Sequence, residues 1–144
     1  MRESIEIRIA TQADVNRIAN LLVQLGYPTE ISEFEKRFKR LLKDENELIY
    51  VAVIANQVCG FISMHFIPQI AMEGDFARIS YFCVDQAFRD QKVGQKLLAE
   101  AERCASLRDC DRIELHCAAH RHAAHLFYRK QNYIESAKYL MKKL

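Results

Sequence analysis

The chain has 144 residues, of which 50% are hydrophobic and 28% are charged, and its formal net charge at pH 7 is +2. This length predicts a single domain over residues 1–144, and the composition excludes a disordered or collagen-like chain. Basic and acidic residues are interspersed, so no charged block points to nucleic acid or a membrane as a partner.

The N-terminal part of the chain predicts one strand followed by two helices. Residues 5–9 alternate isoleucine with charged side chains, which is the period of a half-buried strand. Thr11 to Asp14 is typical of a capped helix start, and the helical spacing that follows stops at Gly26. The capping-box pattern recurs at Ser32 to Glu35, so we expect a second helix over 31–42.

Three strand-like runs come next along the chain. Residues 48–55 and 58–67 are separated by Asn56 and Gln57, which predicts an antiparallel hairpin with a tight turn. Residues 76–85 are rich in aromatic and branched side chains, which favours a third strand.

The C-terminal part alternates helices and strands. Apolar positions at helical spacing up to Arg108 predict a helix, and 112–118 predicts a short strand. A short helix over 123–131 and a terminal strand over 134–144 complete the order β-α-α-β-β-β-α-β-α-β. The strand-helix-strand unit within 76–118 implies a parallel pair in an otherwise antiparallel sheet, so the fold class is mixed α/β (α+β).

The export and redox signals favour a cytoplasmic protein. The N-terminus lacks the continuous apolar run of a signal peptide, and the longest apolar run, 48–55, is too short to cross a bilayer. Five cysteines, an odd number with no CxxC pair, are typical of reduced thiols. Among them, Cys83 is expected to be a buried small hydrophobe rather than a reactive thiol.

The stretch RDQKVGQKLL, from Arg89 to Leu98, carries the strongest chemical signal. A strand, a basic loop and a helix in this order leave the first backbone N–H groups of the helix free to point into the loop. Gly94 removes the side chain that would keep a phosphate away, and Arg89 and Lys92 add positive charge. Neither GxxxxGK[ST] nor GxGxxG occurs. The stretch fits a pyrophosphate cradle, with a solvated loop as the alternative.

Two motifs and the order of elements resemble the GNAT (Gcn5-related) N-acetyltransferase superfamily over essentially the whole chain. Its acetyl-CoA motif reads Q/R-x-x-G-x-G/A, which this chain matches at Arg89 and Gly94, with Lys92 where the family usually has glycine. A second landmark, A-x-x-x-Y followed by G-F/Y, is matched by Ala124 to Tyr128 and then by Asn132-Tyr133, with asparagine in place of glycine. Asparagine tolerates the left-handed conformation well, so this departure is mild.

The resemblance implies a mixed, mostly antiparallel sheet of six to seven strands with a central splayed parallel pair, flanked by about four helices. It implies an acetyl-CoA-dependent N-acetyltransferase that moves the acetyl group directly to a primary amine of a small molecule, without a metal. Backbone groups near 82–84 would bind the pantetheine arm and polarise the thioester carbonyl, and loop amides would hold the pyrophosphate. The implied cofactor-binding residues are Phe82, Cys83, Val84, Arg89, Asp90, Gln91, Lys92, Val93, Gly94, Gln95 and Arg121.

The proton transfers are only partly assigned by the resemblance. Tyr128 is implied as the general acid that protonates the departing thiolate. Many similar proteins carry a glutamate as general base at the position of Ser80, and a serine there cannot take a proton from an ammonium group unless it is activated. Glu73, Asp75 or His65, acting through water, or an amine that arrives neutral, are the alternatives.

Other readings of the sequence stay open. The histidines and cysteines between His116 and His125 do not predict a zinc site, because neighbours on a strand point to opposite faces. Acetylation of a protein lysine or N-terminus is a second possible activity. A non-catalytic acetyl-CoA-binding regulator is a third, suggested by Lys92 and Ser80. The final strand could pair across a two-fold axis, which predicts a homodimer.

Overall fold

The structure is a computed structural model that describes residues 4–117, 121–136 and 139–144. The chain divides into two compact units, Met1–Glu114 and Leu115–Leu144, which are described separately below. In the described residues, no helix is long and apolar enough to span a membrane.

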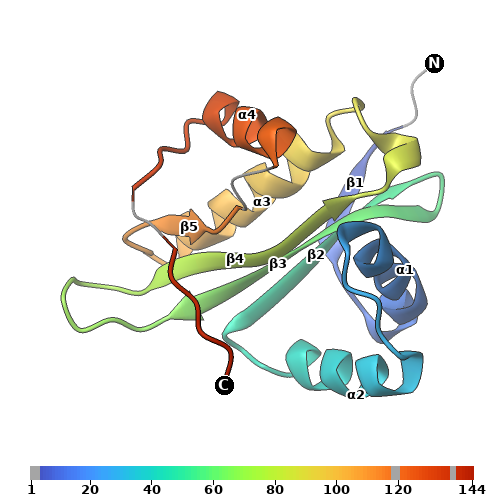
Figure 1. Ribbon diagram of the computed structural model, residues 1–144, viewed down its shortest axis with the longest axis horizontal. Coiled ribbons are helices and arrows are strands. Elements are labelled where there is room, and N and C mark those ends of the chain that lie inside the picture. The colour runs from blue at the N-terminus through green and yellow to red at the C-terminus, as the bar shows by residue number, and fades with distance from the viewer. Residues whose placement is uncertain (1–3, 118–120, 137–138) are drawn as a thin grey trace. The chain divides into compact units, whose positions relative to one another are not determined.

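The first unit is built on a sheet whose strands follow one another in chain order, β1-β2-β3-β4-β5 (Figure 1). Neighbouring strands from β1 to β4 are antiparallel, and β5 lies beside β4 as its parallel partner after a helical crossover. The mixed sheet predicted from the sequence is therefore confirmed. The strands are β1 (Glu6–Ile9), β2 (Glu47–Ile54), β3 (Gln57–Ile67), β4 (Phe76–Val84) and β5 (Ile113–Leu115).

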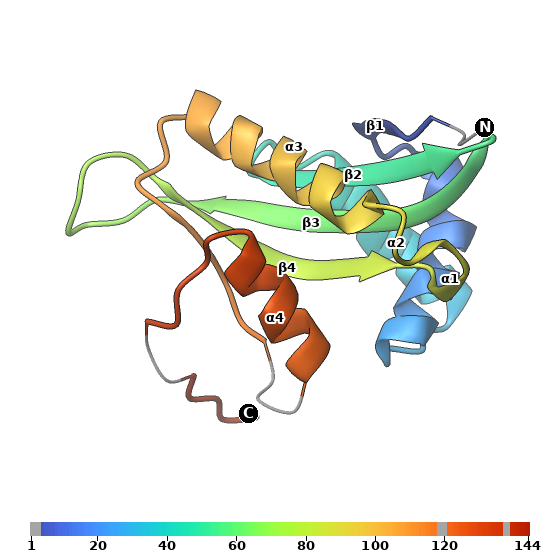
Figure 2. The ribbon, with the colours of Figure 1, turned by 90° about the horizontal axis from the view of Figure 1, so that it is seen from above.

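Helices cover both faces of this sheet (Figure 2). On one face, α1 (Val15–Leu25) contacts β3 and β4, and α2 (Ile31–Leu42) contacts β2. On the other face, α3 (Val93–Leu107) runs along β2, β3 and β4. The buried residues of α3 that pack on the sheet are Val93, Leu97, Leu98, Ala101 and Ala105.

The helix starts show how the N-terminal segment is fixed. The Thr11 N–H donates to the Asp14 carboxylate at 2.8 Å, as the predicted capping box requires, and Arg8 pairs with both oxygens of that carboxylate at 2.8 and 2.9 Å. The N-cap of α2 is Glu30, whose side chain accepts from the N–H groups of Ser32 and Glu33. The capping box expected at Ser32 was therefore wrong, because the longer carboxylate of Glu30 reaches both amides first.

The hairpin between β2 and β3 is confirmed with its turn one residue earlier than expected. Ala55 and Asn56 both have positive φ, 50° and 64°, and Ile54 pairs with Gln57. Positive φ at both central positions is the type I′ geometry that matches the twist of antiparallel strands. Gln57 therefore belongs to β3 rather than to the turn.

The second unit contains α4 (His122–Lys130) but no strand over the described residues of 134–144. Residues 137–138 of that segment lie outside the described residues, as does Ala118 of the strand predicted over 112–118. Ile134 and Leu140 are 87% and 89% exposed, because an alternating pattern gives a strand only where a sheet edge accepts its hydrogen bonds. The described sheet has five strands rather than six to seven, and the terminal strand behind the homodimer prediction is absent from the described residues.

Candidate functional site

The predicted cradle is formed where β4 ends and α3 begins. After Val84, the Asp85 carboxylate accepts from the Ala87 N–H at 2.9 Å and caps the 3-10 turn η2 (Gln86–Phe88). The basic loop follows, and α3 starts at Val93, so that Gly94 is its second residue. The structure thus brings the expected residues from Phe82 to Gln95 together as one strand-loop-helix segment.

The main chain of this loop leaves the first amides of α3 available. Lys92 is the N-cap in the left-handed conformation, φ 67° and ψ 17°, and its side chain makes no capping hydrogen bond. The helical hydrogen bond at this end runs from the Lys96 N–H to the Lys92 carbonyl at 3.1 Å. The N–H groups of the preceding turn therefore have no acceptor within the helix, which makes the turn a site for an anion. Arg89 and Lys92 are exposed beside it.

The loop is anchored to α1 by a buried carboxylate. Asp85, only 8% exposed, forms an ion pair with Arg17, whose Nε also donates to the Val58 carbonyl at 2.7 Å. Gln24 of the same helix accepts from the Gln86 N–H at 3.1 Å. The pKa of Asp85 is held below its usual value chiefly by the hydrogen bond from the Ala87 N–H, and to a smaller extent by Arg17 and Gln24. Sequence reasoning missed this anchor, because nothing local links residues so distant in the chain.

A bulge in β4 interrupts the ladder next to this segment. Ser63 of β3 pairs with Tyr81 and the next residue, Met64, pairs with Ile79, so Ser80 is the extra residue. The Ser63 hydroxyl accepts from the Tyr81 N–H at 3.2 Å and lies 2.6 Å from the Ser80 hydroxyl. A bulge of this kind bends the strand and interrupts the regular pairing at that residue.

Beyond the bulge, Phe82, Cys83 and Val84 form the end of β4 opposite Ile62, Phe61 and Gly60. The Cys83 thiol is buried and lies 3.4 Å from the Leu21 carbonyl of α1. Its side chain therefore serves as core, as the sequence predicted.

A row of charged side chains crosses the opposite end of the sheet. Glu47, His65 and Arg78 are successive cross-strand partners on β2, β3 and β4, and Arg78 Nε donates to Glu114 of β5 at 2.9 Å. The Glu47 side chain is 2% exposed, and its Oε2 lies against Nδ1 of His65. Burial, with a smaller contribution from Asp44, raises the pKa of Glu47 to about 8. Burial also lowers the pKa of His65.

The other acidic candidates are less well placed for proton transfer. Asp75 lies 4.0 Å from Arg108, and its carbonyl accepts from the Asp111 N–H, so its backbone and side chain both serve the fold. Glu73 is exposed in the loop between β3 and β4.

Tyr27, which follows α1, contacts Tyr81 of β4 edge-to-face with 5.3 Å between ring centroids.

In the second unit, Tyr128 lies on α4 and Arg121 is the N-cap of that helix. Burial, with a smaller contribution from Cys117 and an opposing one from Arg121, raises the pKa of Tyr128 to about 12. Asn132 has φ 69°, the left-handed conformation that the resemblance implies where the family has glycine. Residues 118–120 of the run between His116 and His125 lie outside the described residues.

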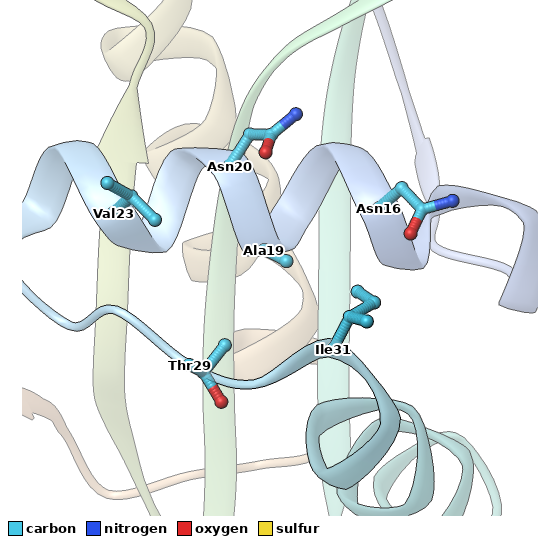
Figure 3. Close-up of a pocket in the computed structure, with 6 residues that line it drawn as sticks. All are labelled: Asn16, Ala19, Asn20, Val23, Thr29 and Ile31. Atoms are coloured by element: carbon cyan, nitrogen blue, oxygen red, sulfur yellow. The ribbon is translucent and has the colours of Figure 1, made fainter.

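A separate groove of about 420 Å³ lies between α1 and the segment that enters α2 (Figure 3). It has no titratable side chain in its lining, so it offers binding surface but no acid or base. Its lining residues are Asn16, Ala19, Asn20, Val23, Thr29 and Ile31.

Comparisons with known proteins agree with this geometry. A family model described as "Acetyltransferase (GNAT) family" matches residues 15–133. The aminoalkylphosphonate N-acetyltransferase of Salmonella typhimurium is 30% identical over 132 residues, which cover 91% of this chain and 86% of that protein.

Solved structures share the fold at lower identity. A transcriptional regulator from Bacillus halodurans C-125 superposes with a TM-score of 0.91 at 24% identity, covering 98% of this chain and 100% of that one. The aminoglycoside N-acetyltransferase AAC(6')-Iy, solved with CoA, has a TM-score of 0.89 at 12% identity, covering 100% of this chain and 97% of that one.

Proposed function

The chain belongs to the acetyltransferase (GNAT) family and is an N-acetyltransferase, and from this premise we propose that it transfers the acetyl group of acetyl-CoA directly to the primary amine of a small molecule. The observation that carries the proposal is the anion-binding turn at the start of α3, built on the segment where the family motif falls. The family match runs from residue 15 to 133, across the boundary at Glu114, which supports one functional domain over 1–144.

The residues of the cradle fit a pyrophosphate. The amides of the first turn of α3 have no acceptor within the helix, and the helix dipole adds positive potential there. Gly94 lies in that turn without a side chain, and Arg89 and Lys92 supply charge from the loop. In the proposal, the main chain and side chains from Arg89 to Gln95 hold the diphosphate, and Arg121 contacts the same cofactor.

The end of β4 would hold the reacting group. When bound, acetyl-CoA supplies an acetyl thioester whose carbonyl becomes an oxyanion as the amine attacks. Phe82, Cys83 and Val84 follow the bulge at Ser80 and pair with β3 along one edge of β4, and in the proposal their backbone groups bind the pantetheine arm. One N–H there stabilises the developing negative charge.

Tyr128 is proposed as the general acid. Its pKa of about 12 keeps the phenol protonated at neutral pH, so it can donate to sulfur as negative charge develops. Its position in an A-x-x-x-Y helix followed by a left-handed Asn132 supports the assignment.

The small-molecule acceptor is supported by the relatives. The Salmonella typhimurium relative is named for aminoalkylphosphonates, and a protein of the same fold is named for aminoglycosides. Both names denote small amines, and they differ in charge, so the panel of acceptors must include anionic and cationic amines. A protein lysine or N-terminus is the alternative acceptor.

Calorimetric titration with acetyl-CoA, followed by a thiol-release assay on that panel, tests the proposal. We expect the native protein to bind and Gly94→Glu to lose binding, because a side chain and a negative charge would fill the cradle. Ala99→Glu, which adds the same charge on the exposed side of α3, should bind normally. Binding without turnover on any small amine or peptide would instead indicate an acetyl-CoA-binding regulator.

A further inference from the structure

In the described residues, Oε2 of Glu47 is the one buried side-chain oxygen or nitrogen with no regular hydrogen bond, and its close contact is with the ring of His65. Glu47 stands at the start of β2, and its Oε2 lies against the ring of His65 on the neighbouring strand. A carboxylate in such a place costs free energy unless it is paired or protonated. The fold therefore keeps a titratable group at a position where an apolar side chain would be more stable.

The second member of the pair reaches solvent. The side chain of His65 is 41% exposed, and its Nδ1 is the nitrogen that contacts Glu47. Within the described part of the chain, no hydrogen bond is found at its other nitrogen, Nε2. A carboxylate that holds Nδ1–H fixes the tautomer in which Nε2 carries the lone pair, and this is how a histidine is made into a base.

Polar side chains lie near this pair on the same strand, at the bulge in β4. Ser63 and His65 are two residues apart on β3, so they lie on the same face, about 7 Å apart along the strand. The Ser63 hydroxyl lies 2.6 Å from that of Ser80, the bulged residue of β4. Two linked hydroxyls therefore lie at the bulge, and one of them belongs to the same face of β3 as His65.

We propose that Glu47 and His65 form the proton-accepting pair of the acetyl transfer, with His65 taking the proton of the substrate ammonium and Glu47 positioning and charging the imidazole. The proposal rests on the acetyltransferase function proposed above and names the base for that reaction.

The acetyl transfer moves protons between the substrate amine, His65 and Tyr128. An N–H bond of the ammonium breaks, and its proton passes through water to His65 Nε2, where it forms the new N–H bond. The nitrogen lone pair then forms the new C–N bond while the C–S bond breaks. Tyr128 gives its proton to the departing sulfur and regains one from the nitrogen of the new amide. The proton on the Glu47–His65 pair is released to solvent.

The charges around the pair set when it can act. Asp44 raises the pKa of both members, and Arg78, which faces His65 from β4, lowers that of His65. Arg78 is itself paired with Glu114. Glu47 and His65 titrate as a coupled pair, so the proton that they share belongs to the pair rather than to either residue. The base form appears as this proton leaves, so kcat should rise with pH and level off above about pH 8.

Steady-state kinetics of three variants test the proposal. We expect His65→Gln to lower kcat about 100-fold at pH 8 and to remove the rising limb of the pH profile, with the acetyl-CoA Kd unchanged. In Glu47→Gln the limb should move to lower pH, because the remaining imidazole has a pKa below its usual value. Added imidazole should restore part of the activity of His65→Ala. Glu45→Gln, an exposed glutamate beside the same strand, is the matched control.

The alternatives give different results. A uniform loss of rate with the limb in place would show that the pair serves only the fold, and would overturn the proposal. Two acceptor amines of different pKa should be compared as well. If the pH at which kcat rises follows the pKa of the amine, the amine arrives neutral and the proposal is overturned. Absence of turnover by the native protein would overturn the proposed function itself. If the native protein turns over and the rise of kcat with pH is the same in His65→Gln and Glu47→Gln, only the role of the Glu47–His65 pair is overturned.

Discussion

Arg17 of α1 and Asp85 at the end of β4 form a partly buried ion pair that ties the helix to the start of the cradle loop. Their side chains are 25% and 11% exposed. Asp85 also caps η2, so one carboxylate fixes both the position and the conformation of the chain that leads to α3. We therefore expect the pair to influence acetyl-CoA binding through the position of the loop.

Asp85→Ala should cost about 2 kcal/mol of unfolding free energy, since it leaves Arg17 unpaired at a partly exposed site and removes a cap. We expect the acetyl-CoA Kd to rise about 10-fold, because about 1.4 kcal/mol would be needed to order the loop again. Urea unfolding and calorimetry measure the two effects. Asp109→Asn, at an exposed turn position with φ 57°, should change neither. Unchanged affinity in Asp85→Ala would show that the loop is ordered without the pair.

Lys92 occupies the one cradle position where the chain departs from the family glycine, and it does so at φ 67°. A side chain costs about 1 kcal/mol in this conformation, which glycine adopts freely. We expect Lys92→Gly to be more stable than Lys92→Ala by about 1 kcal/mol in urea unfolding, because both variants lose the charge and only glycine loses the strain. Equal stabilities would mean that the loop relaxes out of the left-handed conformation.

Gly60 lets α3 approach the sheet closely. A Cβ there would lie 3.0 Å from the Cys83 carbonyl oxygen and 3.3 Å from Val93 at the first turn of α3. Gly60→Val should therefore destabilise the protein by about 1–3 kcal/mol and weaken acetyl-CoA binding, as α3 moves away from β4. Gly26→Ala is the control: it strains the backbone at φ 105° but contacts nothing, so it should cost stability and leave the Kd unchanged. Equal Kd values in both variants would contradict the prediction.

Local patterns predicted most of the fold, because period and capping residues act within a few positions. The stripe of α2 and the hairpin of β2 and β3 follow from residues that are neighbours in sequence. The terminal strand over 134–144 could not be judged in this way, since strand pairing depends on which sheet edge is accessible. Likewise Ser32 matched the capping pattern, and Glu30 took its place through a longer side chain.

The residues of the candidate site were likewise predictable only where the signal lies within a few positions of sequence. The cradle was predicted because its glycine and basic residues are contiguous, and the left-handed Asn132 because a motif marks it. Arg17 and Glu47 gave no such signal. Arg17 is the one charged residue of α1, where it would be assigned to the exposed face, and Glu47 begins an apolar strand, where a glutamate would be assigned to the surface. Their roles depend on partners brought close only by the antiparallel sheet.

Glu47 should make the stability of the protein depend on pH. Its pKa is about 8 in the folded state and about 4.3 in an unfolded chain, so the folded state favours the protonated form. Its contribution is fully present below pH 4.3 and is lost as the pH rises through 8. Glu47→Gln avoids this loss and should be more stable than the native protein by about 1–3 kcal/mol at pH 9, with little difference at pH 4.5. The pKa shift of His65 is common to both proteins. Parallel stability curves over this range would contradict the prediction.

Tyr128 should protect activity at high pH rather than limit it. A phenol with an ordinary pKa near 10 would lose half of its acid form at pH 10, but burial raises the pKa of Tyr128 to about 12. We therefore expect no fall in kcat between pH 8 and 10.5, and a loss of about 100-fold in Tyr128→Phe with the acetyl-CoA Kd unchanged. Tyr139→Phe, which removes an exposed phenol from the same unit, should keep full activity. A fully active Tyr128→Phe would show that the ring serves only packing, as its contact with Phe127 at 5.3 Å allows, and that another group protonates the thiolate.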